Sequence, residues 1–298
     1  MLKKLRFLIS LLLTITILII IFARINFGDI KTAFDNSDHL LILLASLALF
    51  TTAVIGALRW QTILKLLGSN NNFKDTLVIY LANIPVSKVT PANSGDLVRA
   101  FYLKGDVAIS KNIGGIFAER MFDITVLSIL SIIGGLIFNI KMAVVISVII
   151  ILAIFVFFIL GPKINIFFNE NWRHRINNFF YFSRILVKHP ASLIVIALYT
   201  LALWFIVLLF IKIVFIAFGA TVPFLTIVAV QPLAIFFGLL PFTISGIGAR
   251  EPAMIYLYSG LAPASVIFMV GLTYSTVGIL LLSLLCLPFL FRTIKNKH

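Results

Sequence analysis

Long apolar runs that carry almost no charge are the feature that most restricts what this chain can fold into. Several of them approach or exceed the roughly 18 residues typical of a membrane-crossing helix. Of 298 residues, 61% are hydrophobic and only 11% charged, whereas soluble domains are about 25% charged. Lipid permits helices or a closed barrel, and continuous rather than alternating runs favour helices. We therefore expect an all-α, polytopic membrane helix bundle, multi-pass in the cell membrane.

Six segments are predicted to be full spans. They are residues 7–22, 40–58, 112–138, 142–160, 191–217 and 264–291. The longest polar connection, 161–190, is too short for a soluble catalytic domain of about 100 residues. It is either a loop that sets topology or an interfacial helix on anionic lipid. We expect residues 1–298 to form a single transmembrane domain.

Two further apolar segments are interrupted by Pro and Gly. Residues 75–90 run into P-A-N-S-G-D, and residues 225–240 run into P-F-T-I-S-G-I-G-A-R-E. Pro removes a backbone donor and Gly admits unusual dihedral angles, so both segments indicate helix–break–helix hairpins. Basic residues in 59–111 and 161–190 place these regions in the cytoplasm. Those near the ends of the chain place both termini there as well: Lys3, Lys4, Arg6, Arg292, Lys295 and Lys297. With six full spans and both termini in the cytoplasm, the first hairpin must be re-entrant from the inside and the second from the outside.

The two hairpins also suggest an internal repeat with units at about 40–138 and 191–291. Each unit has Pro, then Ser-Gly, then an ionic pair, then Tyr-Leu. The first unit has Pro91 and Tyr102-Leu103 at the ends of this string, and the second has Pro241 and Tyr256-Leu257. Inverted repeats with broken helices are a transporter architecture, with the site near the midplane where the breaks meet.

Ionisable side chains at membrane depth are expensive and mark candidate functional residues. The candidates are Asp96, Arg99, Glu119, Arg120, Asp123, Arg250 and Glu251. Glu119 and Asp123 share a helix face and repel each other unless a cation lies between them, which Arg99, Arg120 or a substrate amine could supply. These groups either lock the hairpins as internal ion pairs or face a hydrophilic cavity that takes a charged headgroup.

The breaks are also candidate anion sites, because helix N-termini present unpaired N–H groups to phosphate. The residues concerned are Asn93, Ser94, Gly95, Ser245, Gly246 and Gly248. Gly271, Ser275 and Gly278 have the spacing of close helix packing. One Cys and four scattered His residues give no metal-site pattern, so we expect no metal ion, cofactor or nucleic-acid partner.

Four strings resemble the lysylphosphatidylglycerol synthase transmembrane, or flippase-like, family. They are L-R-W at 58–60, P-A-N-S-G-D-L-V-R-A at 91–100, A-E-R-M-F-D at 118–123 and P-F-T-I-S-G-I-G-A-R-E at 241–251. The resemblance implies a membrane domain that moves lipids between leaflets. In two-domain synthases of this family it is joined to a soluble aminoacyl-transferase domain. That domain has no counterpart here, so we expect this chain not to make lysyl-lipid by itself.

Three functional hypotheses follow. The leading one is a non-enzymatic, flippase-like protein that passes an anionic or phosphate-containing lipid headgroup through a polar cavity between the hairpins. Arg99, Arg120 and Arg250 would then contact phosphate. The alternative is a membrane subunit that scaffolds a separate lipid-modifying synthase or glycosyltransferase. The third is an intramembrane enzyme that uses Glu119 and Asp123 as acid–base groups.

Overall fold

The structure, a computed structural model, describes residues 27–90, 93–103, 107–163, 169–239, 243 and 246–295, together with positions 12, 16 and 19. All regular elements in these ranges are helices, which confirms the all-α prediction. Apart from those three positions, the predicted span 7–22 lies outside the described residues. Pro91, Pro241 and Ser245 lie outside them as well.

Within the described ranges, five helices are long and apolar enough to cross a bilayer. They are α3 (His39–Leu66), α5 (Ile109–Ile137), α6 (Lys141–Leu160), α9 (Pro190–Ala217) and a continuous helix Ala264–Thr293. A 28-residue helix such as α3 is about 42 Å long, which exceeds the roughly 30 Å hydrocarbon core. These helices correspond to five of the predicted spans, and the multi-pass membrane architecture is confirmed.

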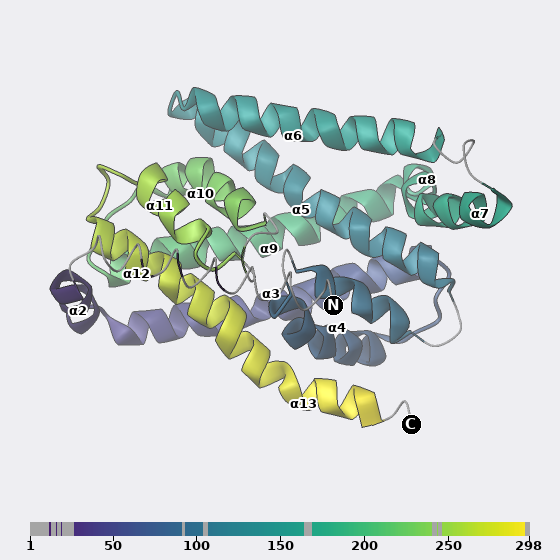
Figure 1. Ribbon diagram of the computed structural model, residues 1–298, viewed down its shortest axis with the longest axis horizontal. Coiled ribbons are helices and arrows are strands. Elements are labelled where there is room, and N and C mark those ends of the chain that lie inside the picture. Colours follow the sequence, from purple (N-terminus) through teal and green to yellow (C-terminus); the bar gives the residue numbers. More distant parts are fainter. Residues whose placement is uncertain are drawn as a thin grey trace.

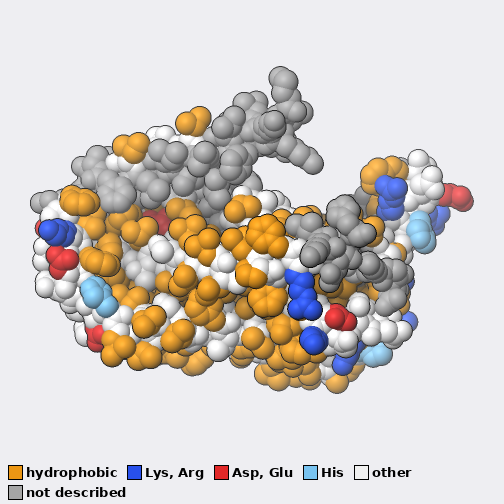
Figure 2. All heavy atoms as spheres, turned by 90° about the horizontal axis from the view of Figure 1, so that it is seen from below, with side chains coloured by type: hydrophobic (Ala, Val, Ile, Leu, Met, Phe, Trp, Pro, Cys, Tyr) orange, Lys and Arg blue, Asp and Glu red, His pale blue; other side chains and the backbone are white. Residues whose placement is uncertain are grey.

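The last long helix is built from three pieces. It begins as α12 (Ala264–Ser275), passes through a π-helical segment η3 (Thr276–Leu281) and continues as α13 (Leu282–Lys295). Figure 1 shows it starting near α2 and crossing the molecule obliquely, with its C-terminal end short of α7 and α8. Apolar side chains cover much of the face seen in Figure 2, as expected for a surface solvated by lipid.

Three shorter helices complete the ends of the bundle. They are α2 (Phe27–Asp35), α7 (Glu170–Phe179) and α8 (Tyr181–Lys188). Helices α7 and α8 lie together at one end, opposite α2 (Figure 1). The 161–190 connection therefore contains two helices, while its contact with lipid stays a prediction.

Both predicted hairpins are interrupted where the Pro and Gly residues occur. The first consists of α4 (Phe73–Lys88) and the 3₁₀-helix η1 (Ser94–Phe101), and the second of α10 (Phe224–Leu239) and α11 (Arg250–Leu257). Each break folds back tightly on the helix before it. A Cβ on Gly95 would lie 2.4 Å from the Val86 carbonyl oxygen, and one on Gly246 would lie 2.7 Å from Gly238. Both positions therefore require glycine.

Helices α3 and α9 pack antiparallel, and this sets where the hairpins begin. The Asp38 N–H, at the start of α3, donates to the Ala217 carbonyl at the end of α9 over 2.9 Å. Since α4 follows the end of α3 and α10 follows the end of α9, the two hairpins enter the bundle from opposite ends. In Figure 1, α10 and α11 accordingly lie toward one end and α4 toward the other.

The two series of elements also match in order and length. Helices α3 and α9 each have 28 residues, α4 and α10 each have 16, and η1 and α11 each have 8. The long helices that follow have 29 residues in α5 and 30 in Ala264–Thr293. This correspondence is what a repeat requires, although the repeat itself and its orientation in a membrane stay predictions.

One predicted boundary is wrong, and the error matters for the site. The span predicted to end at residue 58 continues to Leu66, so Arg59 is inside a helix rather than in a cytoplasmic loop. Its side chain is 1% exposed. Within the helix Arg59 has buried carboxylate partners, which a count of basic loop residues cannot reveal.

Candidate functional site

Glu119 and Asp123 lie one turn apart on α5 and share a single cation. Arg59 of α3 donates to Glu119 Oε1 and to Asp123 Oδ1, both over 2.6 Å. It also donates to Thr200 Oγ1 of α9 over 3.0 Å. The sequence predicted a cation between these carboxylates, but the residue that fills this position is Arg59 rather than Arg99 or Arg120.

Arg99 and Asp96 of η1 turn toward α5 and not toward each other. Arg99 donates to Glu119 Oε2, and its guanidinium lies 4.2 Å from the centre of the Trp60 ring. Arg120 donates to Asp96, and to Asp123 Oδ2 over 3.2 Å. Asp96 and Arg99 are three residues apart and face the same way in a 3₁₀-helix, which lets both reach the α5 cluster.

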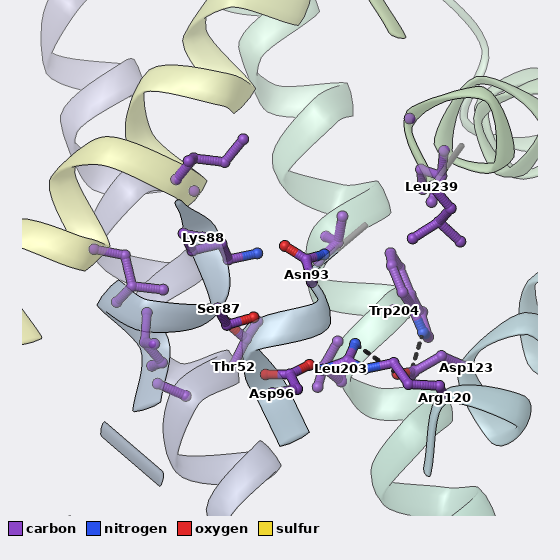
Figure 3. A pocket seen from close by; sticks show the side chains of 18 of the residues that line it. Thr52, Ser87, Lys88, Asn93, Asp96, Arg120, Asp123, Leu203, Trp204 and Leu239 are labelled. Atoms are coloured by element: carbon purple, nitrogen blue, oxygen red, sulfur yellow. Dashed lines mark hydrogen bonds and ion pairs between the residues drawn. The ribbon is translucent and has the colours of Figure 1, made fainter. Parts of the chain in front are cut away.

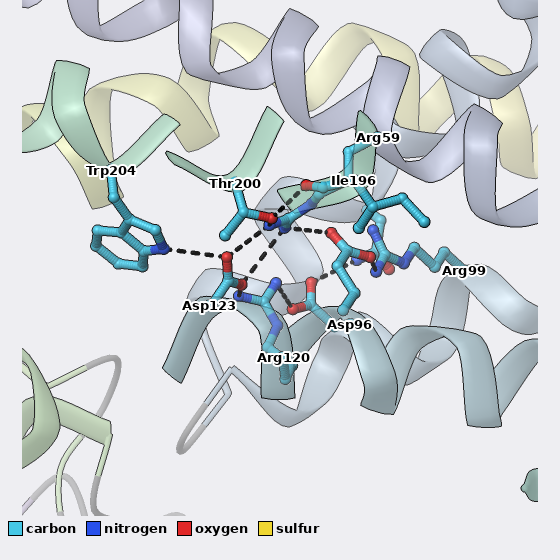
Figure 4. Close-up of polar contacts among 10 residues, drawn as sticks. Arg59, Asp96, Arg99, Arg120, Asp123, Ile196, Thr200 and Trp204 are labelled. Carbon is cyan, nitrogen blue, oxygen red and sulfur yellow. Dashed lines mark hydrogen bonds and ion pairs between the residues drawn. The ribbon is translucent and has the colours of Figure 1, made fainter. Parts of the chain in front are cut away.

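Together these contacts form a buried and electrically balanced network, which we call the first-break network. Its members are Arg59, Asp96, Arg99, Glu119, Arg120 and Asp123. Three arginines face three carboxylates, so the formal charges cancel. Figure 4 shows them converging from α3, η1 and α5, with Thr200 and Trp204 of α9 at the side. Buried charges need such pairing and hydrogen bonding to be tolerated.

The ionic pair after the second break is organised differently. Glu251 Oε2 accepts the Gly248 N–H over 2.6 Å, and Glu251 Oε1 accepts the Ser275 hydroxyl over 2.7 Å. Arg250 donates to Ser275 Oγ over 2.5 Å and lies 3.7 Å from Glu251. These contacts stay within the break, α11 and α12, and Glu251 binds the backbone of the turn that precedes its own helix.

Two of the backbone N–H groups predicted to bind anions already have partners inside the protein. The Gly95 N–H donates to Thr90 Oγ1 over 2.7 Å, and the Gly248 N–H donates to Glu251. Positive φ angles at Asn93, Gly246 and Gly248 shape the two turns. Gly95 and Gly248 therefore stabilise the breaks, and an anion would have to be held by side chains nearby.

A cavity of about 340 Å³ lies between the two breaks. Its charged lining comes from α4, η1, α5 and α11. The lining includes the predicted residues Asn93, Asp96, Arg99, Arg120, Asp123 and Arg250. Figure 3 shows Lys88, Asn93, Asp96, Arg120 and Trp204 around this space. The rest of the lining is mostly apolar, with residues of α3, α9, α10 and η3 such as Ala53, Val207 and Ile235.

Some predicted residues do not line the cavity but lie next to it. Glu119 is fully buried and binds Arg59 and Arg99, while Glu251 and Gly248 hold each other beside the second break. Ser94, Gly95 and Gly246 shape the breaks and are not part of the described lining. Ser245 is outside the described residues. Whether any of these residues binds substrate stays a prediction.

The sequence interpretation missed Arg59, Lys88, Trp204 and Ser275. Arg59 and Lys88 were counted only as cytoplasmic basic residues. Arg59 belongs to a helix that extends further than expected, and Lys88 is the last residue of α4, inside the predicted segment 75–90. Trp204 Nε1 donates to Asp123 Oδ1 over 3.1 Å from within an apolar span. Ser275 was assigned to packing, but its hydroxyl joins Arg250 and Glu251. A polar group embedded in an apolar run was the available signal for Arg59.

Comparison with known proteins agrees with this architecture. A UPF0104 membrane protein of Methanocaldococcus jannaschii is 28% identical over 119 residues, which are 39% of this chain and 35% of the relative. That match therefore spans about a third of the relative's length. Residues 7–286 match the family described as the lysylphosphatidylglycerol synthase TM region. The matched range includes both hairpins and the cavity between them, so this chain belongs to the lysylphosphatidylglycerol synthase transmembrane-region family.

Proposed function

We propose that this protein moves a lipid with a phosphate-containing headgroup between the two leaflets. The headgroup passes through the cavity between the breaks, and the acyl chains stay in lipid. The observation that carries the proposal is a charged cavity at the point where two hairpins from opposite ends of the bundle meet. Ionisable groups inside a membrane bundle typically mark substrate pathways, and broken helices mark the site in inverted-repeat transporters.

The size and lining of the cavity suit part of a lipid rather than a whole one. About 340 Å³ is near the lower end of the 300–1,000 Å³ usual for small-molecule pockets. A headgroup fits this space, whereas two acyl chains do not. The apolar lining from Ala53, Val207 and Ile235 offers a surface along which the first methylene groups of a lipid can lie.

The contacts of Glu119 and Asp123 argue against the acid–base enzyme. Arg59 donates to both carboxylates, and Arg99 and Arg120 each add a further contact. A general acid or base must give up or take a proton at the reacting atom, while these carboxylates are engaged as charged anchors between helices. We therefore propose a non-enzymatic role, with both termini in the cytoplasm.

Reconstitution into liposomes with labelled lipids tests the proposal, and two adjacent threonines supply a matched pair of variants. Thr52 lines the cavity, whereas Thr51 is exposed on the outside of α3. Both hydroxyls bond the carbonyl three residues earlier. Thr52→Phe should fill the cavity and slow transbilayer movement, and Thr51→Phe should leave it unchanged. Movement equal to that in protein-free vesicles for every lipid would favour the scaffold instead.

Labelling from either side of the membrane tests the orientation. Cys286 is the single cysteine of the sequence and is buried, so its background reaction should be low. Lys65 at the end of α3 and Ser259 after α11 are both exposed. Lys65→Cys should react with an impermeant maleimide from the cytoplasmic side and Ser259→Cys from the opposite side. Reaction of both from one side would contradict the opposed hairpins.

A further inference from the structure

Among the described residues, Lys88 is the charged side chain of the cavity lining that has no ion pair. It is the last residue of α4 and lines the cavity between the breaks. Every other charged side chain in the described lining belongs to an ion pair: Asp96, Arg99, Arg120, Asp123 and Arg250. Lys88 makes no ion pair or hydrogen bond with any described residue, and Figure 3 shows its amine directed into the space beside Asn93.

The formal charges of the described residues around the cavity therefore do not sum to zero. The first-break network contains three arginines and three carboxylates, and the second break contributes Arg250 with Glu251. Both groups are neutral in formal charge, so the described residues of the site carry one excess positive charge, on Lys88. A buried or half-buried charge without a counter-ion is costly. An occupant with one negative charge removes that cost, and a cationic occupant increases it.

We propose that Lys88 is the anchor for a single phosphodiester, and that the lipid recognised here is monoanionic, without a compensating amine. This rests on the proposed role of the cavity as a headgroup site, though not on transport itself. A lysine ammonium is a compact point charge that binds phosphate through one or two oxygens. Phosphatidylglycerol has the required charge, whereas phosphatidylcholine is neutral overall and lysyl-phosphatidylglycerol is cationic.

Two other features agree with this assignment. Asn93 lines the cavity next to Lys88 and adds a polar amide to this side of the lining. Arg120 has a side chain that is 34% exposed although both of its terminal nitrogens bind carboxylates. Arg120 therefore lines the cavity with its charge paired, whereas Lys88 has no ion pair with a described residue.

Lipid binding to the purified protein in detergent tests the proposal directly. The probes are fluorescent phosphatidylglycerol, phosphatidylcholine and lysyl-phosphatidylglycerol, and the variants are Lys88→Gln, Lys88→Arg and Lys74→Gln. Lys74 is an exposed lysine of the same helix and serves as the control. We expect Lys88→Gln to bind phosphatidylglycerol about tenfold more weakly or worse, the scale of one lost charged hydrogen bond. Phosphatidylcholine binding should not change, and Lys88→Arg should keep most of the affinity.

A structural role for Lys88 gives a different result. A lysine in the last turn of a helix can instead stabilise the helix dipole. In that case Lys88→Gln would lower the melting temperature, and the affinities for all three lipids would fall together or not at all, which would overturn the proposal. We expect the melting temperature of Lys88→Gln to equal or exceed that of the parent, because an unpaired charge is removed.

Further experiments distinguish a lipid phosphate from free phosphate, and the Lys88 anchor from lipid translocation. Inorganic phosphate that displaced phosphatidylglycerol at similar concentration would overturn the lipid assignment in favour of a free anion. Phosphatidylglycerol binding that depends on Lys88, in a protein that moves no lipid across vesicles, would refute translocation and support the anchor. Transport that is slowed by Thr52→Phe but is equal for Lys88→Gln and Lys74→Gln would support translocation and overturn the anchor.

Discussion

The two breaks resemble each other in backbone and differ in how their charges are held. Each follows a 16-residue helix, folds back on it through a glycine and leads into an eight-residue helix. At the first break, Asp96 and Arg99 bind α5, and α5 in turn binds Arg59 of α3. At the second, Glu251 binds its own turn and Ser275. The first hairpin is thus attached to the bundle by ion pairs, and the second mainly by local hydrogen bonds and packing.

This difference predicts that neutralising a carboxylate lowers the free energy of unfolding more at the first break than at the second. The largest effect should come from Glu119→Gln, because Arg99 loses its carboxylate and Arg59 loses one of two. Breaking a buried ion pair costs about 3–5 kcal/mol. The free energy of unfolding in mixed micelles measures it, with Glu170→Gln on the exposed face of α7 as control. Equal values for these two variants would remove the basis of the comparison.

Both breaks fold back on the preceding helix at a glycine, and a substitution at Gly246 tests this feature. Its φ is +82° and a Cβ there would lie 2.7 Å from Gly238, so Gly246→Ala adds both strain and a clash. Strain of about 1–2 kcal/mol and overpacking of about 1–3 kcal/mol together predict a loss of about 3 kcal/mol. Gly260 has a φ of +81° with nothing within 4 Å, so Gly260→Ala isolates the strain. The unfolding free energies of the two variants should differ by the cost of the clash.

Glu251→Gln should cost less than Glu119→Gln. The amide oxygen can still accept from Gly248 or Ser275, and Arg250 is 3.7 Å away. We expect a loss of about 2 kcal/mol in the free energy of unfolding. A loss larger than that of Glu119→Gln would show that the second break is the more firmly fastened of the two.

Trp204→Phe should have the smallest effect. It removes the donor to Asp123 Oδ1, but Asp123 keeps Arg59 and Arg120 as partners and the aromatic bulk remains. The expected loss is about 1 kcal/mol, measured in the same unfolding titration. A much larger loss would place α9 inside the first-break network rather than at its edge.

Local rules accounted for part of the site. The Pro and Gly residues marked both breaks, and Arg120 with Asp123 is a helix pair three residues apart that sequence spacing anticipates. Local rules failed at Arg59, which is 60 residues from Glu119 and 64 from Asp123. Side-chain spacing within one helix carries no information about partners on another, so the arginine looked like a loop charge.

The sequence alone determined that the chain lies in lipid, where its long helices fall and where two of them break, because these follow from apolar content and backbone chemistry. Which charges neutralise one another followed only from how the helices pack. The antiparallel packing of α3 and α9 brings Arg59 and Thr200 together, and the fold of η1 onto α5 engages Asp96 and Arg99. Lys88 is left as the unbalanced charge by these pairings, which long-range packing sets and spacing along the chain does not.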